Sequence, residues 1–580
     1  IPQIFWYNSF VLISNGLDSK LGTLTASYEH FSNWKKLKED DKKPSIFLDQ
    51  ILKGTCSPEN ILDLIENFIL YTSINNKEIK SIAKNHQFLG VNRSVESFKK
   101  RKENQGRLGV FWHTQGSGKS FSMIFLAQKI LRKFQGNYTF VVVTDRDELD
   151  DQIYKNFQDS GVVTEKNVQA KDGAHLKELL KENHRMVFTL IHKFHTNKGE
   201  TYPELSKRDD IIVMTDEAHR SQYDTLALNM RNALPNASFI GFTGTPLMKK
   251  GEEKTRDTFG GYVSEYNFKD SVDDNATVPL YYENRVPELQ LINPNLTEEI
   301  YDIIDDADLS EKEQEKVEKR LGSNYDIITR EDRLNTIAED IATHFLSRGY
   351  SGKAMVLSID KFTTVRMYDK VKYHLNKKLE ELTIKLRSAS SDEQLAIKEK
   401  ISEIKKLDMA VVISSEQNEI KKFSDKGLQI KSHRERMIKE DLAEKFKNPE
   451  DSFKIVFVCN MWITGFDVPS ISTIYLDKPM KNHTLMQAIA RANRVFQDKL
   501  GGFIVDYISV FKNLKEALAI YASSRDGSGD LPIESKDKLF EVLKEYFKQL
   551  NQFLKSNRVN LEKIDLAKGM EKYPHLFEAR

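Results

Sequence analysis

The sequence predicts an α/β protein built from two parallel-sheet lobes, and two observations carry that prediction. Short apolar runs rich in β-branched and aromatic residues alternate with helical patterns, which is the form that helix-covered parallel sheets take in a sequence. The runs also fall into two groups, separated by an acidic and polar stretch at 284–350. Each group holds enough strands for a sheet of its own, so two separate lobes are the simplest organisation.

The expected strands are short and continuously apolar, as strands buried on both faces are. In the first lobe they are residues 109–113, 139–144, 186–190, 211–215 and 238–242, and in the second lobe residues 353–358, 409–413, 454–459, 473–476 and 502–505.

The expected domains follow chain order: a junction at 1–75, the first lobe at 76–283, a connector with helices at 284–350, the second lobe at 351–515 and part of a C-terminal helical domain at 516–580. Within the second lobe, apolar residues in 375–407 recur at helical spacing on both sides of a polar break at 388–392. This pattern predicts a helical hairpin inserted in that lobe.

Composition excludes several classes of protein. No apolar run reaches 18 residues, so we expect no membrane span. The two cysteines, Cys56 and Cys459, are too few for a disulfide framework or a zinc site and favour a reducing cytoplasm. The net charge is only +1, so any DNA track must be a local basic stripe rather than a basic total.

A glycine-rich loop follows the first expected strand and precedes an apolar helix. Glycines such as Gly116 and Gly118 let the backbone turn its N–H groups toward phosphate oxygens, and the helix adds its positive N-terminal end. Lys119 would contact the phosphates and Ser120 would bind Mg²⁺. His113 stands where the full phosphate-loop pattern has its first glycine. The alternative is an ordinary glycine-rich turn before a helix.

An acidic cluster follows the expected strand at 211–215. The carboxyl ends of parallel strands open onto the crevice where ligands bind. Asp216 is suited to hold Mg²⁺ and Glu217 to polarise the attacking water, while His219 could couple the nucleotide state to the rest of the lobe. Taken alone, the cluster could also be an acidic strand-end turn.

Together, Asp216-Glu217-Ala218-His219 and the Lys119 loop resemble the superfamily 2 helicases and translocases. The resemblance implies two RecA-like lobes that bind ATP and Mg²⁺, with Thr243-Gly244-Thr245-Pro246 coupling hydrolysis to movement. The implied ATP contacts are Gln87 at the adenine, then Gln115, Gly116, Ser117, Gly118, Lys119, Ser120, Gly465 and Asp467. The implied DNA contacts are Arg146, Lys193, Thr243 and Thr464, and the implied Mg²⁺ ligands are Ser120 and Asp216.

The segment QAIARANR at 487–494 resembles motif six of the same superfamily. It offers Arg491 and Arg494 as arginine fingers, which would reach from the second lobe to the γ-phosphate held by the first. Such an arginine stabilises transition-state charge and contributes on the order of 10³-fold or more. The alternative is a solvated helix face, since a spacing of three also brings the two arginines together on a helix. Ala490 stands where many relatives have glycine.

Within the superfamily, the chain most resembles the restriction (R) subunit of type I restriction-modification enzymes. The resemblance runs from residue 1 to about 510 and is carried by residues 1–35 and the segments HQFLGVN, VFWHTQGSGKSFSM, VTDRDELDDQI, TDEAHRSQY, GFTGTPL and TGFDVPSISTIYLDKPMKNHTLMQAIARANR. It implies translocation along double-stranded DNA, with methylase (M) and specificity (S) subunits as partners. In that family an endonuclease domain precedes the motor, and we expect this domain to be missing here.

Three other functions fit parts of the pattern. A strand-separating DNA or RNA helicase would share every ATPase motif and would differ in unwinding a duplex. A non-enzymatic ATPase-like scaffold would not need to keep Lys119, Ser120, Asp216, Glu217 and Arg494 together. A signalling GTPase or a kinase would not need a second lobe with an arginine motif.

Overall fold

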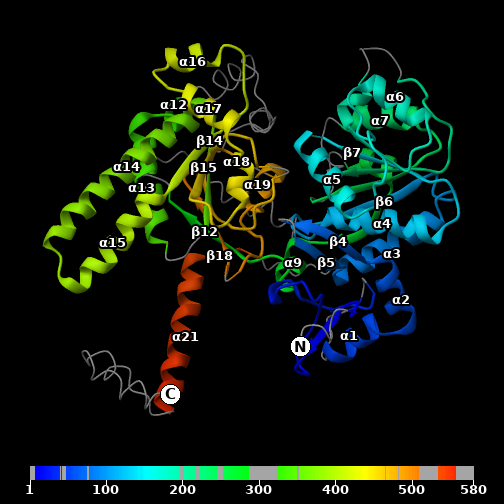
Figure 1. Cartoon of the computed structure of the whole chain (residues 1–580), viewed down its shortest axis with the longest axis horizontal. Coiled ribbons are helices and arrows are strands. Elements are labelled where there is room, and N and C mark those ends of the chain that lie inside the picture. The colour runs from blue at the N-terminus through cyan, green and yellow to red at the C-terminus, as the bar shows by residue number, and fades with distance from the viewer. Residues whose placement is uncertain are drawn as a thin grey trace.

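The computed structural model describes residues 7–38, 41, 47–74, 77–145, 147–195, 202–216, 223–244, 252–285, 323–348, 352–463, 466–480, 482–497, 499–508 and 533–556. Two α/β lobes stand side by side, and the N-terminal segments lie beneath the first lobe (Figure 1). None of the helices in this described part combines the length and apolar character needed to cross a bilayer.

The first lobe is a six-stranded parallel sheet in the order β11-β6-β10-β9-β7-β8. Its strands are β6 (Arg107–His113), β7 (Thr139–Thr144), β8 (Met186–Leu190), β9 (Ile211–Asp216), β10 (Ser238–Thr243) and β11 (Tyr262–Tyr266). The five strands expected in this lobe are therefore confirmed. Sequence reasoning missed β11, because its sequence YVSEY mixes polar and apolar residues as an edge strand does.

Helices cover both faces of this sheet, and each face has its own apolar cluster. The helices of this lobe are α3 (Asn85–Lys99), α4 (Lys119–Lys133), α5 (Asp147–Asp159), α6 (Gly173–Lys181), α7 (Tyr223–Ala233) and α8 (Glu252–Phe259), with the short η3 (Ile191–Phe194). A sheet buried on both faces places its strand ends at the surface, where loops are free to form a site.

The N-terminal segments pack onto the first lobe. They form a small antiparallel sheet of β1 (Val11–Ser14), β2 (Ser19–Gly22) and β3 (Ser32–Asn33), with η2 (Tyr28–His30) between β2 and β3. Helices α1 (Phe47–Thr55) and α2 (Pro58–Asn67) follow, and then the hairpin of β4 (Ile69–Ile74) and β5 (Lys77–Ile82). Trp34 is buried, and its ring centroid lies 5.2 Å from that of Phe88 on α3. The residues around Trp34 thus share the core of the first lobe.

The second lobe is a seven-stranded parallel sheet in the order β14-β15-β13-β16-β17-β12-β18. Its strands are β12 (Leu280–Asn284), β13 (Lys353–Ser358), β14 (Asp408–Val412), β15 (Phe453–Val458), β16 (Ile471–Asp477), β17 (Gly502–Asp506) and β18 (Ile533–Ser535). The five strands expected in this lobe are confirmed, and β12 and β18 are additions.

The chain crosses between lobes earlier than the boundary predicted at 283. Strand β11 ends in the first sheet at Tyr266, whereas Phe268 on α9 (Phe268–Asp273) is buried in the core of the second lobe. Strand β12 then joins the second sheet between β17 and β18. The boundary in the sequence was drawn at the polar stretch, but the packing of Phe268 and Leu280 decides where the second lobe begins.

The helices of the second lobe include the expected hairpin. It consists of α14 (Lys361–Ser388) and α15 (Ser391–Lys406), between β13 and β14. The other helices are α12 (Ser323–Ile328), α13 (Glu331–Ser347), α16 (Glu419–Asp425), α17 (Lys431–Lys439), α18 (Leu442–Lys447) and α19 (Asn482–Ile489), and α21 (Lys536–Ser556) follows β18. Helix α14 begins before the predicted 375, because its first half packs Val365 and Val371 into the core of the lobe.

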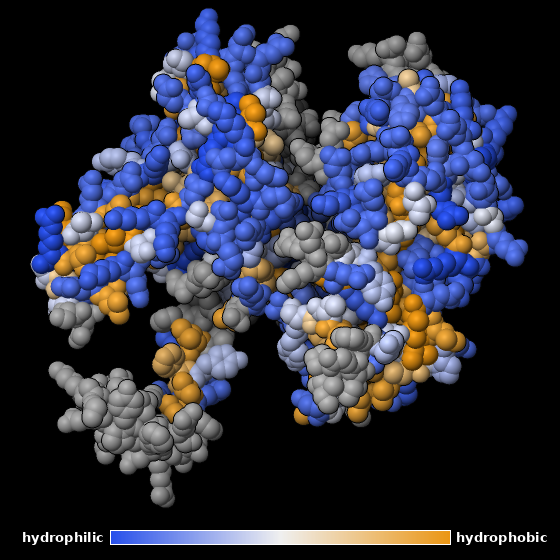
Figure 2. Space-filling model, viewed as in Figure 1, coloured by the Kyte–Doolittle hydropathy of each residue, from blue (hydrophilic) through white to orange (hydrophobic). Residues whose placement is uncertain are grey.

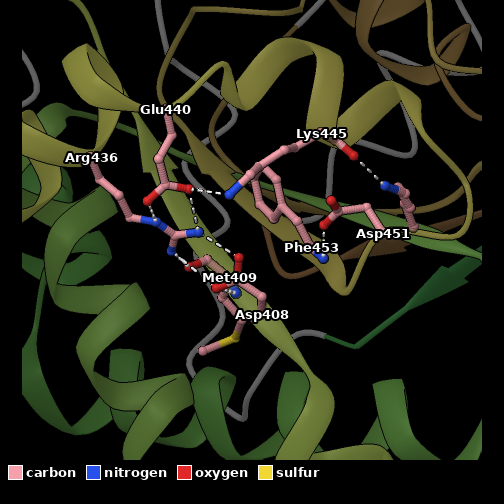
Figure 3. A network of polar contacts seen from close by, with 8 residues as sticks. Asp408, Met409, Arg436, Glu440, Lys445, Asp451 and Phe453 are labelled. Carbon is pink, nitrogen blue, oxygen red and sulfur yellow. Dashed lines mark hydrogen bonds and ion pairs between the residues drawn. The ribbon is translucent and has the colours of Figure 1, made fainter.

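A polar network holds α17 and α18 against the start of β14 (Figure 3). Arg436 lies at its centre: its Nε donates to Glu440 at 2.8 Å, and its Nη1 donates to the Met409 carbonyl at 2.8 Å and to Asp408 at 3.0 Å. Lys445 donates to the other oxygen of Glu440 at 2.6 Å. These contacts raise the pKa of Arg436 against the lowering effect of burial, so the guanidinium stays charged and satisfies several acceptors at once.

A buried ion pair joins α13 to the carboxyl end of β16. Arg333 donates from Nη2 to Asp477 Oδ1 at 2.6 Å, and the two side chains are 1% and 0% exposed. Burial raises the pKa of Asp477 to about 6, although Arg333 opposes this shift. A carboxyl whose pKa is higher in the folded state stabilises the fold when it is protonated, and this contribution is lost as the pH rises through the folded pKa.

When the pH falls from 7 to 5, the free energy of unfolding of the wild-type chain should therefore rise relative to that of the Asp477→Asn variant, whose side chain cannot titrate. The expected gain in unfolding free energy is about 1 kcal/mol, from a shift of about two pKa units. Urea unfolding at both pH values measures it, and the Asn variant reports the titration of all other groups. Equal pH dependence in the two proteins would contradict the raised pKa.

Candidate nucleotide-binding site

The glycine-rich loop lies at the carboxyl end of β6 and leads into α4, as predicted. Gly116 and Gly118 have φ values of 91° and 84°, a region that other residues rarely adopt. Ser117 closes the turn, since its backbone N–H and its Oγ both donate to the Thr114 carbonyl, at 3.2 and 2.7 Å. A Cβ at Gly118 would lie 2.6 Å from the Nε2 of Gln87, a flexible side chain that can shift, so it is the left-handed backbone that favours glycine there.

Lys119 begins α4 and holds its ammonium inside the edge of the sheet. Its Nζ donates to the His113 carbonyl at 3.2 Å, and a Cβ placed on Gly244 would lie 3.1 Å from the same Nζ. Gly244 follows β10, so the lysine stands between the ends of β6 and β10. Ser120, the second residue of α4, is half-buried beside it.

Gln87 and His86 on α3 support this loop from below. Gln87 donates from Nε2 to the Gly118 carbonyl at 2.9 Å, and its Oε1 accepts from the Lys84 N–H at 2.9 Å. The Nε2 of His86 lies 3.0 Å from the Ser117 carbonyl, which makes this nitrogen the donor. Burial lowers the pKa of His86 to about 4, so the ring is neutral near pH 7.

The acidic strand end lies at the same edge of the sheet. Asp216 is the last residue of β9 and is buried, and it lies opposite Phe242 in the neighbouring β10. Thr243 ends β10 and is also buried. Parallel strands place such ends together, so the structure brings Asp216 and Thr243 to the edge where the loop lies.

Some of the predicted residues are not among those that the structure describes. Glu217, His219, Arg146, Thr464 and Gly465 lie outside the described residues. Lys193 lies on η3, where its Nζ donates to the Ala170 carbonyl of the first lobe. This bond uses one of the three N–H donors of the ammonium, so the DNA contact of Lys193 stays a prediction.

The two arginines of the second lobe contact the loop of the first. Arg491 is buried and donates from Nη2 to Gln115 Oε1 at 3.3 Å, while its Nη1 donates to the Phe466 carbonyl. Arg494 approaches the next residue, since a Cβ on Gly116 would lie 3.0 Å from its Nη1. Asp467 pairs with the Nε of Arg494 at 3.2 Å. The surface-helix alternative is wrong, because both side chains point into the contact between the lobes.

Cations gather at this contact. Lys84 is half-buried near Arg494, and desolvation together with this neighbour lowers its pKa. Burial also lowers the pKa of Lys499 to about 7, with Arg494 adding to the shift and Asp467 opposing it. Sequence reasoning missed both lysines. Lys84 could have been noticed from its place three residues before Gln87, whereas Lys499 carries no local signal.

The residues at this edge of the first sheet fit a nucleoside triphosphate bound with Mg²⁺. The positive φ values of Gly116 and Gly118 favour glycine in the loop, and Lys119, Arg491 and Arg494 supply positive charge around it. Among the described residues, no group of three or more His, Cys, Asp or Glu side chains could hold a metal by itself. Mg²⁺ commonly binds through one or two carboxylates and the substrate phosphates, so the predicted ligands Asp216 and Ser120 would not need a larger cluster of protein ligands.

Comparison with known proteins finds two families along the chain. The SWI2/SNF2 ATPase family matches residues 86–315, and type I restriction enzyme subunit R domain 3 matches residues 350–509. The type I restriction enzyme HindI endonuclease subunit of Haemophilus influenzae is 37% identical over 579 residues, covering 93% of this chain and 51% of the relative. A Methanocaldococcus jannaschii protein, provisionally named the type I restriction enzyme MjaIXP endonuclease subunit, is 36% identical over 583 residues, covering 95% and 52%.

Among solved structures, a fragment of a provisionally assigned HsdR subunit of a type I restriction enzyme from Vibrio vulnificus is similar, with a TM-score of 0.46 and 15% identity. The match covers 91% of this chain and 79% of that one. The chain spans about half the length of the curated relatives that it matches.

Proposed function

Because the chain belongs to the family of type I restriction enzyme R subunits and carries a SWI2/SNF2 ATPase region, we propose that it hydrolyses ATP between its two lobes and uses the turnover to move along double-stranded DNA. One observation carries the proposal. Arg491 and Arg494 of the second lobe reach Gln115 and Gly116 of the glycine loop in the first. An ATPase of this class needs this arrangement, because the arginine must meet a phosphate held by the other lobe.

Each group has a role in this proposal. Lys119 and the loop N–H groups bind the β- and γ-phosphates, and Ser120 and Asp216 hold Mg²⁺. Gln87 contacts the adenine. Glu217 polarises the attacking water.

Arg494 offsets the charge that develops on the γ-phosphoryl group, and Arg491 holds the loop through Gln115. ATP binding then favours closed lobes. Product release favours open ones, so the DNA grip of each lobe alternates with turnover.

The whole protein would act in a restriction complex in the cytoplasm. We propose that methylase and specificity subunits recruit it to DNA and that the longer R subunit cleaves DNA after translocation. The contacts with DNA would be mainly to phosphates, through Arg146, Lys193 and Thr464, because a translocase must pass over every sequence. Thr243 was expected to contact DNA as well, but it is fully buried at the end of β10, so this contact is not carried over.

Duplex DNA should stimulate ATP hydrolysis, and the DNA affinity should fall about tenfold or more between 50 and 200 mM salt, because phosphate contacts release counterions. The measurement is the ATPase rate against DNA concentration at both salt concentrations, with and without the methylase and specificity subunits.

In the same complex, a triplex-forming strand should be displaced while the duplex stays paired. Separation of the duplex strands would instead favour the helicase alternative, and DNA-independent turnover would contradict the proposal.

A further inference from the structure

Residues 267–279 form a strap that connects the lobes. The strap begins directly after β11 of the first lobe and contains α9, whose Phe268 and Val272 pack on the core of the second lobe. In Figure 1, α9 lies in the gap beneath the two lobes. The strap is therefore packed on the second lobe, although it starts directly after β11 of the first.

The strap is bonded to the segment that carries the arginine finger. The Val278 N–H donates to the Asn493 carbonyl at 2.7 Å, and Thr277 forms an antiparallel β-bridge with Arg494. Within the strap, the hydroxyls of Ser271 and Thr277 lie 2.9 Å apart. The backbone position of Arg494 is thus fixed by the strap rather than by α19 alone.

Asp274 ties the strap to the first lobe and to the N-terminal segment. Its Oδ1 lies 2.8 Å from Lys35 Nζ, and its Oδ2 accepts from the Tyr266 hydroxyl at 3.0 Å. Lys35 also donates to the Asp273 carbonyl at 2.5 Å. The cavity beside these groups is only about 30 Å³, which leaves room for one or two waters, so the carboxylate is held in a close contact.

The same contact continues to the glycine loop. The Tyr266 ring stacks on the His86 ring, with centroids 3.8 Å apart and an interplanar angle of 10°. His86 in turn bonds the Ser117 carbonyl of the loop. A continuous set of contacts therefore runs from the loop through His86 and Tyr266 to Asp274, and from the strap to Arg494.

We propose that Asp274, held by Lys35 and Tyr266, is a positioning residue that sets Arg494 against the glycine loop when the lobes close. The inference rests on the proposed ATPase function. Asp274 touches no reacting atom in this arrangement. The contacts of its carboxylate with Lys35 and Tyr266 hold the strap on the first lobe, and the bridge from the strap fixes the position of Arg494. Losing the carboxylate leaves the loop and Lys119 intact but lets the second lobe sit further from them.

Asp274→Asn keeps the size of the side chain and removes its charge. We expect kcat for ATP to fall about tenfold while KM changes less than about twofold, because transition-state contacts are lost and ground-state binding is kept. Lys35→Met should give a similar fall. The double variant should be no slower than either single one, since the two groups act as a unit. Asp274→Glu should recover much of the rate.

Asp49→Asn is the matched control. Asp49 pairs with Lys53 at 2.7 Å on α1 of the same N-terminal segment, but both side chains are exposed and the pair lies within one helix. This variant should turn over ATP at the wild-type rate. An unchanged kcat in Asp274→Asn, or losses that multiply in the double variant, would overturn the positioning role.

A second readout needs no turnover. In a Cys56→Ser background, dyes on Glu182→Cys in the first lobe and Lys439→Cys in the second report the separation of the lobes by energy transfer. Asp274→Asn should lower the transfer efficiency and Asp49→Asn should not. Equal efficiencies would overturn the inference even if ATPase fell. A fall in efficiency in a chain without ATPase activity would support the strap while rejecting the proposed function.

Discussion

Lys119→Ala should lower ATP turnover by about 10²- to 10³-fold, with or without DNA. The glycine loop places Lys119 between the ends of β6 and β10, and its ammonium donates there to the His113 carbonyl at 3.2 Å. A preorganised charge aimed at developing phosphate charge contributes about this much when it is removed from an active site. Steady-state phosphate release measures the effect.

The fold should survive this change, because alanine is a good helix former at the start of α4. Thermal unfolding tests this expectation. Lys133→Ala is the matched control, since Lys133 lies at the exposed end of the same helix and pairs with Glu66. Turnover that persists in Lys119→Ala would reject the site, whereas loss in Lys133→Ala would point to a general effect on α4.

Arg494→Ala should lower kcat by about 10³-fold while ATP still binds. The guanidinium reaches the loop of the other lobe, next to Gly116, and is oriented there by Asp467. An arginine in that place stabilises charge that exists mainly in the transition state, so its loss appears in kcat rather than in binding. The measurement is single-turnover hydrolysis together with binding of a fluorescent ATP analogue.

Two comparisons sharpen this test. Arg494→Lys keeps the charge but loses the planar fork, so it should recover only part of the rate. Arg387→Ala removes an exposed arginine from the end of α14 and should change nothing. If Arg494→Ala hydrolysed ATP normally while Arg491→Ala did not, the arginine finger would be Arg491 instead.

Arg491 differs physically from Arg494. It is buried, and its donors contact Phe466, Gln487 and Gln115. Truncating it would leave buried acceptors without their partner, which costs stability as well as activity. The two arginines looked equivalent in the sequence, and only their different surroundings separate a structural contribution from a catalytic one.

The strands that are most continuously apolar in the sequence are also those whose bounds were predicted most accurately. Residues 139–144 and 353–358 were predicted to the residue, because each is a run of buried apolar side chains that ends at a polar or glycine-containing turn. By contrast, β11 and β12 were missed. YVSEY and LYYEN are short, only partly buried and mixed in polarity without a regular alternation, and such a run does not distinguish a strand from a loop.

The sequence by itself determined the local chemistry of the site. Two glycines, a lysine and a serine between a strand and a helix specify a phosphate loop, because backbone freedom and helix charge act over a few residues. The tertiary structure alone decided which distant groups meet that loop. Arg491 of the second lobe contacts Gln115 of the first, 376 positions away, and Thr277 forms a β-bridge with the distant Arg494. Such contacts depend on how whole sheets pack, and no local pattern in the sequence specifies which distant residues this packing brings together.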